Sequence, residues 1–120
     1  MIRLVISVPG KFYSDAITKA LEKTGNFRVQ PLELPVERDG PEVALLGVSV
    51  HQGFTLEERK EVIKELKERA PKCRIVLFLD ELISPEQTEG VKNLKQARLI
   101  DGFLYASGTM EYLVATLESI

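Results

Sequence analysis

Short apolar runs alternate with longer amphipathic segments along the whole chain. Each apolar run is rich in Val, Ile, Leu or Phe and predicts a β-strand; the runs are residues 2–8, 27–34, 43–50, 73–79 and 99–106. Between and after them, apolar residues recur at helical spacing; these segments are residues 14–25, 55–70, 84–97 and 109–120. Such an alternation is typical of an α/β domain with a parallel sheet.

Polar residues at the ends of the amphipathic segments predict where the helices begin and stop. Thr55 with Glu58, and Ser84 with Gln87, have the spacing of a capping box. Ser14 is the predicted N-cap of the first helix, and Gly25 its C-terminal stop. In the second helix the predicted inward stripe is Leu56, Val62, Ile63 and Leu66.

One connection is too short for an ordinary helix. Only "PVERDGPE", with two prolines and a glycine, separates Leu34 from Val43, where a right-handed crossover usually carries a helix. We therefore expect a single flavodoxin-like domain over residues 1–120, with a doubly wound five-stranded sheet of order 2-1-3-4-5 and a second helix that is short or absent. One face of the sheet should then be poorly covered near the first and third strands.

Composition narrows the classes of partner. The chain has 120 residues, 44% of them hydrophobic, and a formal net charge of -2, so one compact core is expected and a nucleic-acid partner is not. The single cysteine, Cys73, excludes an internal disulfide and favours a reducing compartment such as the cytoplasm. No apolar run is long enough to predict a membrane span.

In this fold, ligands bind at the carboxyl ends of the strands, near the point where the strand order reverses. The crevice expected there is lined by Pro9, Gly10, Gly47, Ser49 and Ser107, and it could serve a small-ligand sensor. His51 has no partner for metal binding, and Asp80 with Glu81 is more typical of a solvated strand end than of a cation site. For Cys73 we expect an inert thiol.

Four stretches of the chain resemble the receiver domains of bacterial response regulators in two-component signal transduction. They are "IRLVISVPGKFYSDAITKAL", "PEVALLGVSV", "APKCRIVLFLDE" and "DGFLYASGTMEYLVATL". The resemblance implies phosphoryl transfer to an aspartate, assisted by an acidic pair that holds Mg²⁺, a hydroxyl residue and a lysine. In this chain those positions are taken by Val8 and Pro9 (acidic pair), Gly47 (nucleophile), Leu79 (hydroxyl) and Ala106 (lysine).

None of the five replacements can supply the family's chemistry. The comparison therefore predicts a degenerate, pseudo-receiver pocket with no catalytic residue, no metal and no cofactor, and a domain that is not an enzyme. The family's switch aromatic matches Phe103, which we expect to stay in the core. A phosphorylatable receiver is the less favoured alternative.

A receiver-like domain without this chemistry can still act by binding another protein. Receivers commonly pair through the surface of their fourth helix, fifth strand and fifth helix, and that resemblance points here to Tyr105, Met110 and Tyr112. The expected partner is another protein or a second copy of the chain, with neither nucleic acid nor membrane involved. An output or ATPase domain is possible in a longer chain.

Overall fold

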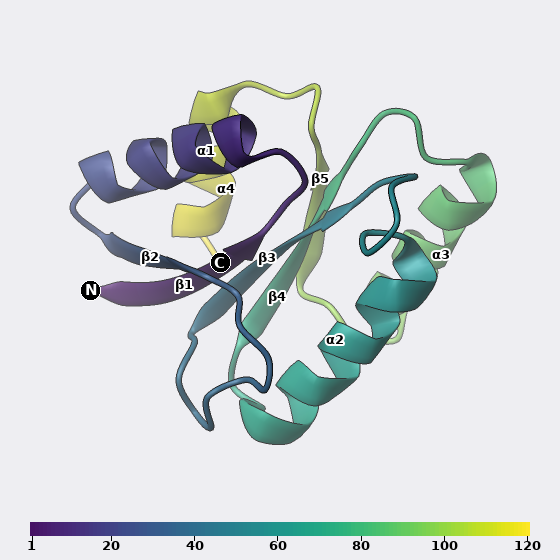
Figure 1. Cartoon of the computed structure of the whole chain (residues 1–120), viewed down its shortest axis with the longest axis horizontal. Helices are drawn as coiled ribbons and strands as arrows, with labels where there is room; N and C mark the ends of the chain where they lie inside the picture. The colour runs from purple at the N-terminus through teal and green to yellow at the C-terminus, as the bar shows by residue number, and fades with distance from the viewer.

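The computed structural model describes residues 1–120 and contains one parallel sheet with helices on both faces (Figure 1). The strand order is β2-β1-β3-β4-β5, as predicted. The elements in chain order are β1 (Ile2–Ser7), α1 (Lys11–Lys23), β2 (Phe27–Pro31), β3 (Val43–Val48), α2 (Leu56–Arg69), β4 (Arg74–Leu79), α3 (Pro85–Gln96), β5 (Gly102–Tyr105) and α4 (Met110–Glu118). No helix is both long and apolar enough to cross a membrane.

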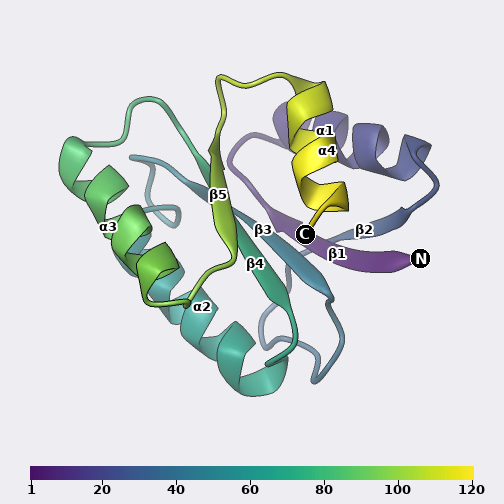
Figure 2. The same cartoon turned by 180° about the vertical axis from the view of Figure 1, so that it is seen from behind.

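Two apolar cores lie on the two faces of the sheet. Along β3 every residue is buried, and successive side chains point to opposite faces, so Leu45 joins the core under α1 and α4 while Leu46 joins the core under α2 and α3. Figure 2 shows α1 and α4 together on one side of the sheet and α2 with α3 on the other. Helix α3 contributes only one fully buried residue, Val91, so its apolar face is thin, as expected.

The second crossover contains no helix, which confirms the prediction from its prolines and glycine. Val36 covers part of the sheet face that a helix would otherwise cover, because its side chain is buried in the core under α2. The linker is held to α2 by a hydrogen bond of 2.6 Å from the Val36 N–H to Glu65 and by the Arg69 side chain, which donates to the Val36 carbonyl. A cavity of about 410 Å³ remains between the linker and strands β1 and β2.

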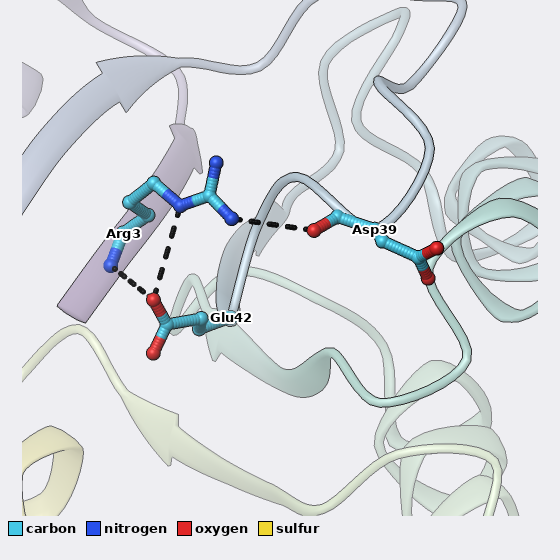
Figure 3. A network of polar contacts seen from close by, with 3 residues as sticks. All are labelled: Arg3, Asp39 and Glu42. Atoms are coloured by element: carbon cyan, nitrogen blue, oxygen red, sulfur yellow. Dashed lines mark hydrogen bonds and ion pairs between the residues drawn. The ribbon is translucent and has the colours of Figure 1, made fainter.

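A polar network ties this linker to the first strand (Figure 3). The Arg3 guanidinium donates to the Asp39 carbonyl at 3.3 Å and lies 3.8 Å from the Glu42 carboxylate, which also accepts from the Arg3 backbone N–H at 3.4 Å. Both side chains are half exposed, so the pair contributes little to stability. Its effect is to position the chain as it enters β3.

Two predicted caps differ from the structure. Helix α1 begins at Lys11 after Gly10, whose φ of 87° breaks the extended backbone there, and Ser14 lies within the first turn of the helix. Ser84 caps α3 by accepting from the Gln87 N–H, but the Gln87 side chain does not return the bond, and its buried Oε1 has no hydrogen-bond partner. The Thr55–Glu58 capping box is complete, as predicted.

Candidate functional site

The carboxyl ends of β1, β3, β4 and β5 meet at one edge of the sheet, which we call the C-terminal edge. Parallel pairing sets Ser7 opposite Leu46, Val48 opposite Leu79, and Leu79 opposite Tyr105. The ends of these strands and the turns that follow them are therefore neighbours in space. They hold the five pocket positions, of which the first, Val8, and the last, Ala106, are 98 positions apart in the sequence. All five positions lie at this edge: Val8, Pro9, Gly47, Leu79 and Ala106.

Gly47 is in close contact with the turn after β1. A Cβ atom added to Gly47 would lie 2.7 Å from Cδ of Pro9 and 3.1 Å from Cα of Val8. No real side chain tolerates the first of these distances, so the chain needs a glycine here because a neighbouring backbone passes so near. Gly47 is also buried, and any group placed on it would be removed from water.

Next to Gly47 lies a small cavity of about 80 Å³. It is lined by Val8, Pro9, Tyr13, Val48, Phe78, Asp80 and Ala106. Tyr13 of α1 covers one side: its ring centroid is 5.6 Å from that of Phe78, and its hydroxyl donates to the Ala106 carbonyl at 3.3 Å. Partial burial raises the pKa of Tyr13, so this hydroxyl stays a proton donor at neutral pH. Leu79, fully buried, points to the other face of the sheet.

Beneath the same edge a buried cation joins two strands. Arg59 of α2 is 4% exposed; its Nε donates to the Gly47 carbonyl at 2.7 Å, and its Nη2 donates to the Ser7 carbonyl at 2.7 Å and to Ser7 Oγ at 2.9 Å. The guanidinium also lies 4.5 Å from the centre of the Phe54 ring. Burial lowers the pKa of Arg59 to about 10, and the group remains charged at neutral pH.

Arg59 was not among the residues that the sequence predicted for this region. It stands in the strongly charged run "EERKEVIKELKER", which is typical of a solvated face. The available signal is its spacing: Leu56, Arg59, Ile63 and Leu66 are the residues of α2 that are buried, and their separations of three and four place Arg59 on the inward stripe. The predicted stripe named Val62 instead, which is half-buried.

The predicted interaction residues lie around β5 and α4. Tyr105 and Tyr112 are exposed, Met110 is half-buried, and Tyr105 and Met110 line a shallow crevice together with Tyr13. Phe103 is half-buried against the core under α2, and its ring makes an edge contact with Tyr105 at 6.2 Å between centroids. The structure thus brings Tyr105 and Met110 together and leaves the Tyr112 ring on the exposed face of α4.

Other candidates from the sequence are dispersed. His51 and Glu81 are exposed, while Ser49 is buried and its Oγ accepts from the His51 N–H. Asp80 is half-buried and accepts from the Leu82 N–H at 2.9 Å. Cys73 precedes β4 at the opposite edge of the sheet, and its burial raises the pKa of the thiol to about 11, so it is not a thiolate at neutral pH.

Comparison with known proteins identifies the architecture. A response regulator from Thermotoga maritima superimposes with a TM-score of 0.73, at 15% identity over 99% of this chain and 96% of that one. The fold is that of response-regulator receiver domains. A CheY-like receiver domain protein from Methanospirillum hungatei gives a TM-score of 0.72 at 14% identity over 99% of this chain and 92% of that one.

A third solved structure, described as adenylate cyclase from Rhodopirellula baltica, has a TM-score of 0.75 at 12% identity over 98% of this chain and 84% of that one. No protein-family model matches the chain, and no curated protein matches it. At these identities the similarity concerns the receiver-like fold.

The Mg²⁺ that receiver chemistry uses does not fit the residues at this edge. A hard divalent cation needs several oxygen ligands, yet no group of three or more Asp, Glu, His or Cys residues in the structure could hold a metal ion. Asp80 is the only carboxylate that lines the cavity. The positively charged Arg59 guanidinium already donates to the carbonyls of Ser7 and Gly47, and it would repel a Mg²⁺ ion placed beside them.

Proposed function

We propose that this receiver-like domain lacks a phosphoacceptor and acts as a protein-interaction or dimerisation module in bacterial signalling or in the assembly of a larger complex. The observation that carries the proposal is the contact between Gly47 and Pro9. At 2.7 Å from the Pro9 ring there is no space for a Cβ, and therefore none for a carboxylate at the position that the resemblance assigns to the nucleophile. The domain is then not an enzyme.

The other residues of the pocket support the same conclusion. Catalysis of phosphoryl transfer depends on charges that stabilise the moving phosphoryl group. The resemblance assigns those charges to positions that hold Val8, Pro9, Leu79 and Ala106, all of which are uncharged. The one buried charge nearby, Arg59, is bound to the backbone through Nε and Nη2.

The size of the cavity argues against the alternative of a small-ligand sensor at this edge. Ligand pockets typically enclose about 300–1,000 Å³. The cavity beside Gly47 has about 80 Å³ because Tyr13, Pro9 and Phe78 fill the crevice. A binding module therefore explains the filled pocket better than a sensor does.

We expect no response to phosphoryl donors. Acetyl phosphate with Mg²⁺ should leave the intact mass of the protein unchanged, and beryllofluoride with Mg²⁺ should not shift the amide signals of Gly47, Ala106 or Phe103 in a ¹⁵N spectrum. A bona fide receiver treated in parallel is the positive control. A phospho-adduct, or a metal-dependent shift at these residues, would show that the pocket is active.

The interaction surface of the proposal centres on Tyr105, Met110 and Tyr112. If it joins two copies, the average mass from light scattering should rise with concentration for the wild type and stay at the monomer value for Tyr112→Glu, because burying a carboxylate in an apolar interface is costly. Leu34→Glu, a change at another exposed apolar residue, is the matched control and should still associate. A wild type that stays monomeric throughout would contradict the homodimer.

A further inference from the structure

The cavity between the second crossover and strands β1 and β2 has the size of a ligand site. Its volume is about 410 Å³, and we call it the linker cavity; the side chains that matter below are Val5, Gln30, Leu32, Glu33, Val36 and Glu37. Ligand pockets typically enclose about 300–1,000 Å³. The linker cavity falls within that range, whereas the cavity of about 80 Å³ beside Gly47 does not.

The wall of the linker cavity is fixed at both ends and in the middle. The Leu32 N–H donates to a carbonyl of β1 at 2.9 Å, and the Glu42 N–H donates to another at 2.8 Å. Between them, the Asp39 N–H donates to a carbonyl of α2 at 3.0 Å, and the Val36 side chain is buried in the core. The cavity is therefore formed before any ligand arrives, as most small-molecule sites are.

The floor of the cavity is apolar. Val5 and Leu32 are half-buried against the core under α2, and Val36 belongs to that core. Three prolines complete the lining, and because proline has no N–H, this part of the wall offers no backbone donor. An apolar group of a ligand would be removed from water here, which favours binding.

The polar groups of the cavity are mainly acceptors. Glu33 and Glu37 are exposed at its rim, and their carboxylates take part in no ion pair and no hydrogen bond. Arg3, the one basic residue of the lining, already donates to the Asp39 carbonyl and lies beside the Glu42 carboxylate. Exposed carboxylates alone are ordinary surface. These two differ because they stand over an apolar cavity that is already formed.

We propose that the linker cavity binds a small organic cation, namely an amine whose apolar body packs on Val5 and Leu32 and whose ammonium group donates to Glu33 and Glu37. An ammonium has three donors and no acceptor, and its hydrogen bonds to carboxylates are charge-assisted. Arg28, which lies opposite Arg3 in the register of β1 and β2, is not part of the lining.

This inference goes beyond the proposed function, because it gives the binding module a ligand of its own. The linker cavity lies at the β2 end of the sheet, whereas the proposed interaction surface lies around β5 at the other end. The two sites can therefore be tested separately.

The probe is phenethylamine, with phenylpropionate and phenylethanol as comparators of similar size. In ¹⁵N spectra the amine should shift amide signals of Val5, Gln30, Leu32 and Glu37, and it should bind less tightly as salt is raised. Phenylpropionate should bind at least about tenfold more weakly, because Glu33 and Glu37 repel it, and phenylethanol should fall between the two. Equal binding of the amine and the acid would overturn the proposal.

Neutral variants of the two carboxylates test the choice of a cation. Glu33→Gln with Glu37→Gln keeps the size of both side chains, and it should reduce the advantage of the amine over the acid to less than about threefold. Glu81→Gln with Glu111→Gln changes two exposed carboxylates outside the cavity and should leave that advantage as in the wild type.

A large side chain inside the cavity tests its location. Gln30 is exposed on β2, so Gln30→Trp should fill the cavity without entering the core and should weaken binding of the amine at least about tenfold. Gln52→Trp, at an exposed glutamine in the turn after β3, is the matched control and should bind as the wild type does. Circular dichroism checks that both variants are folded.

Two further results would overturn the assignment. One is binding of phenethylamine that survives Gln30→Trp or that shifts signals only outside the linker cavity. The other is an advantage of the amine over the acid that persists in Glu33→Gln with Glu37→Gln. Neither result alters the experiments with phosphoryl donors and with Tyr112→Glu, which test the proposed function on their own.

Discussion

Replacing Gly47 with aspartate is expected to destabilise the domain by about 3 kcal/mol or more without creating a phosphorylation site. The new Cβ would lie 2.7 Å from Cδ of Pro9, so the turn after β1 has to move, and overpacking of this kind costs about 1–3 kcal/mol. The carboxylate would in addition be buried without a counter-ion in contact, which adds to the loss. Urea unfolding followed by circular dichroism measures the change in free energy.

Two companion variants separate the steric term from the charge. Gly47→Ala adds only the Cβ and should cost about 1–3 kcal/mol. Because the clash is with the proline ring, Gly47→Ala combined with Pro9→Ala should cost less than the sum of the two single changes, by at least about 1 kcal/mol in a double-mutant cycle. Gly102→Ala is the control, since a Cβ at Gly102 meets no atom within 4 Å and should be close to neutral.

The outcome also bears on the proposed function. If Gly47→Asp kept wild-type stability and gained an alkali- and hydroxylamine-labile phosphate from acetyl phosphate with Mg²⁺, the pocket would be one substitution away from activity. We expect the opposite, because Val8, Pro9, Leu79 and Ala106 would still supply none of the charges that the reaction needs.

Much of the fold could be predicted from the sequence because local patterns and the global fold agree. The five apolar runs correspond to the five strands, and their alternation with helices matches the flavodoxin-like fold, whose strand order 2-1-3-4-5 the structure has. The short "PVERDGPE" connection excluded a helix on local grounds alone, since two prolines and a glycine oppose one. Thr55 with Glu58 has no competing role, and its capping box formed as predicted.

The candidate site was harder to predict because its geometry depends on contacts that are distant in sequence. The five pocket positions could be aligned to the receiver pattern, but their spacing does not reveal that the Pro9 ring packs on Gly47 or that Tyr13 fills the crevice. Arg59 was missed since a charged residue in a charged run predicts exposure, and only its place on the stripe with Leu56 and Ile63 indicates burial. Residue type alone favours Ser14 as the N-cap, whereas α1 begins after Gly10, which has a positive φ.

Arg59→Met is expected to destabilise the domain by about 2–4 kcal/mol. Methionine keeps most of the side-chain volume but removes the donors that reach the carbonyls of Gly47 and Ser7 and the Ser7 hydroxyl. Each buried acceptor left without a partner costs about 1–3 kcal/mol. In the wild type, burying the Arg59 cation without a carboxylate partner is itself unfavourable, and this burial lowers the pKa of Arg59. Methionine removes that unfavourable term, which limits the net loss of stability.

Conservative changes test whether the geometry of the guanidinium matters. Arg59→Lys retains the charge, but a single ammonium cannot reproduce the planar fork that bonds to two strands and lies over Phe54, so it should lose nearly as much stability as methionine. Ser7→Ala removes one of the three acceptors and should cost about 1 kcal/mol. Lys60→Met, the next residue on the exposed side of α2, should change stability by less than about 0.5 kcal/mol.

Hydrogen exchange shows where the loss of Arg59 acts. Because Arg59 joins the carboxyl ends of β1 and β3, its removal should raise the exchange rates of amides near Ser7 and Gly47 more than those in β5 or α4. A variant that unfolds at the same urea concentration as the wild type would show that Arg59 is merely accommodated at this edge, and uniformly faster exchange would show that its loss acts through global unfolding alone. Localised opening would instead show that a cation from α2 holds together the carboxyl ends of β1 and β3.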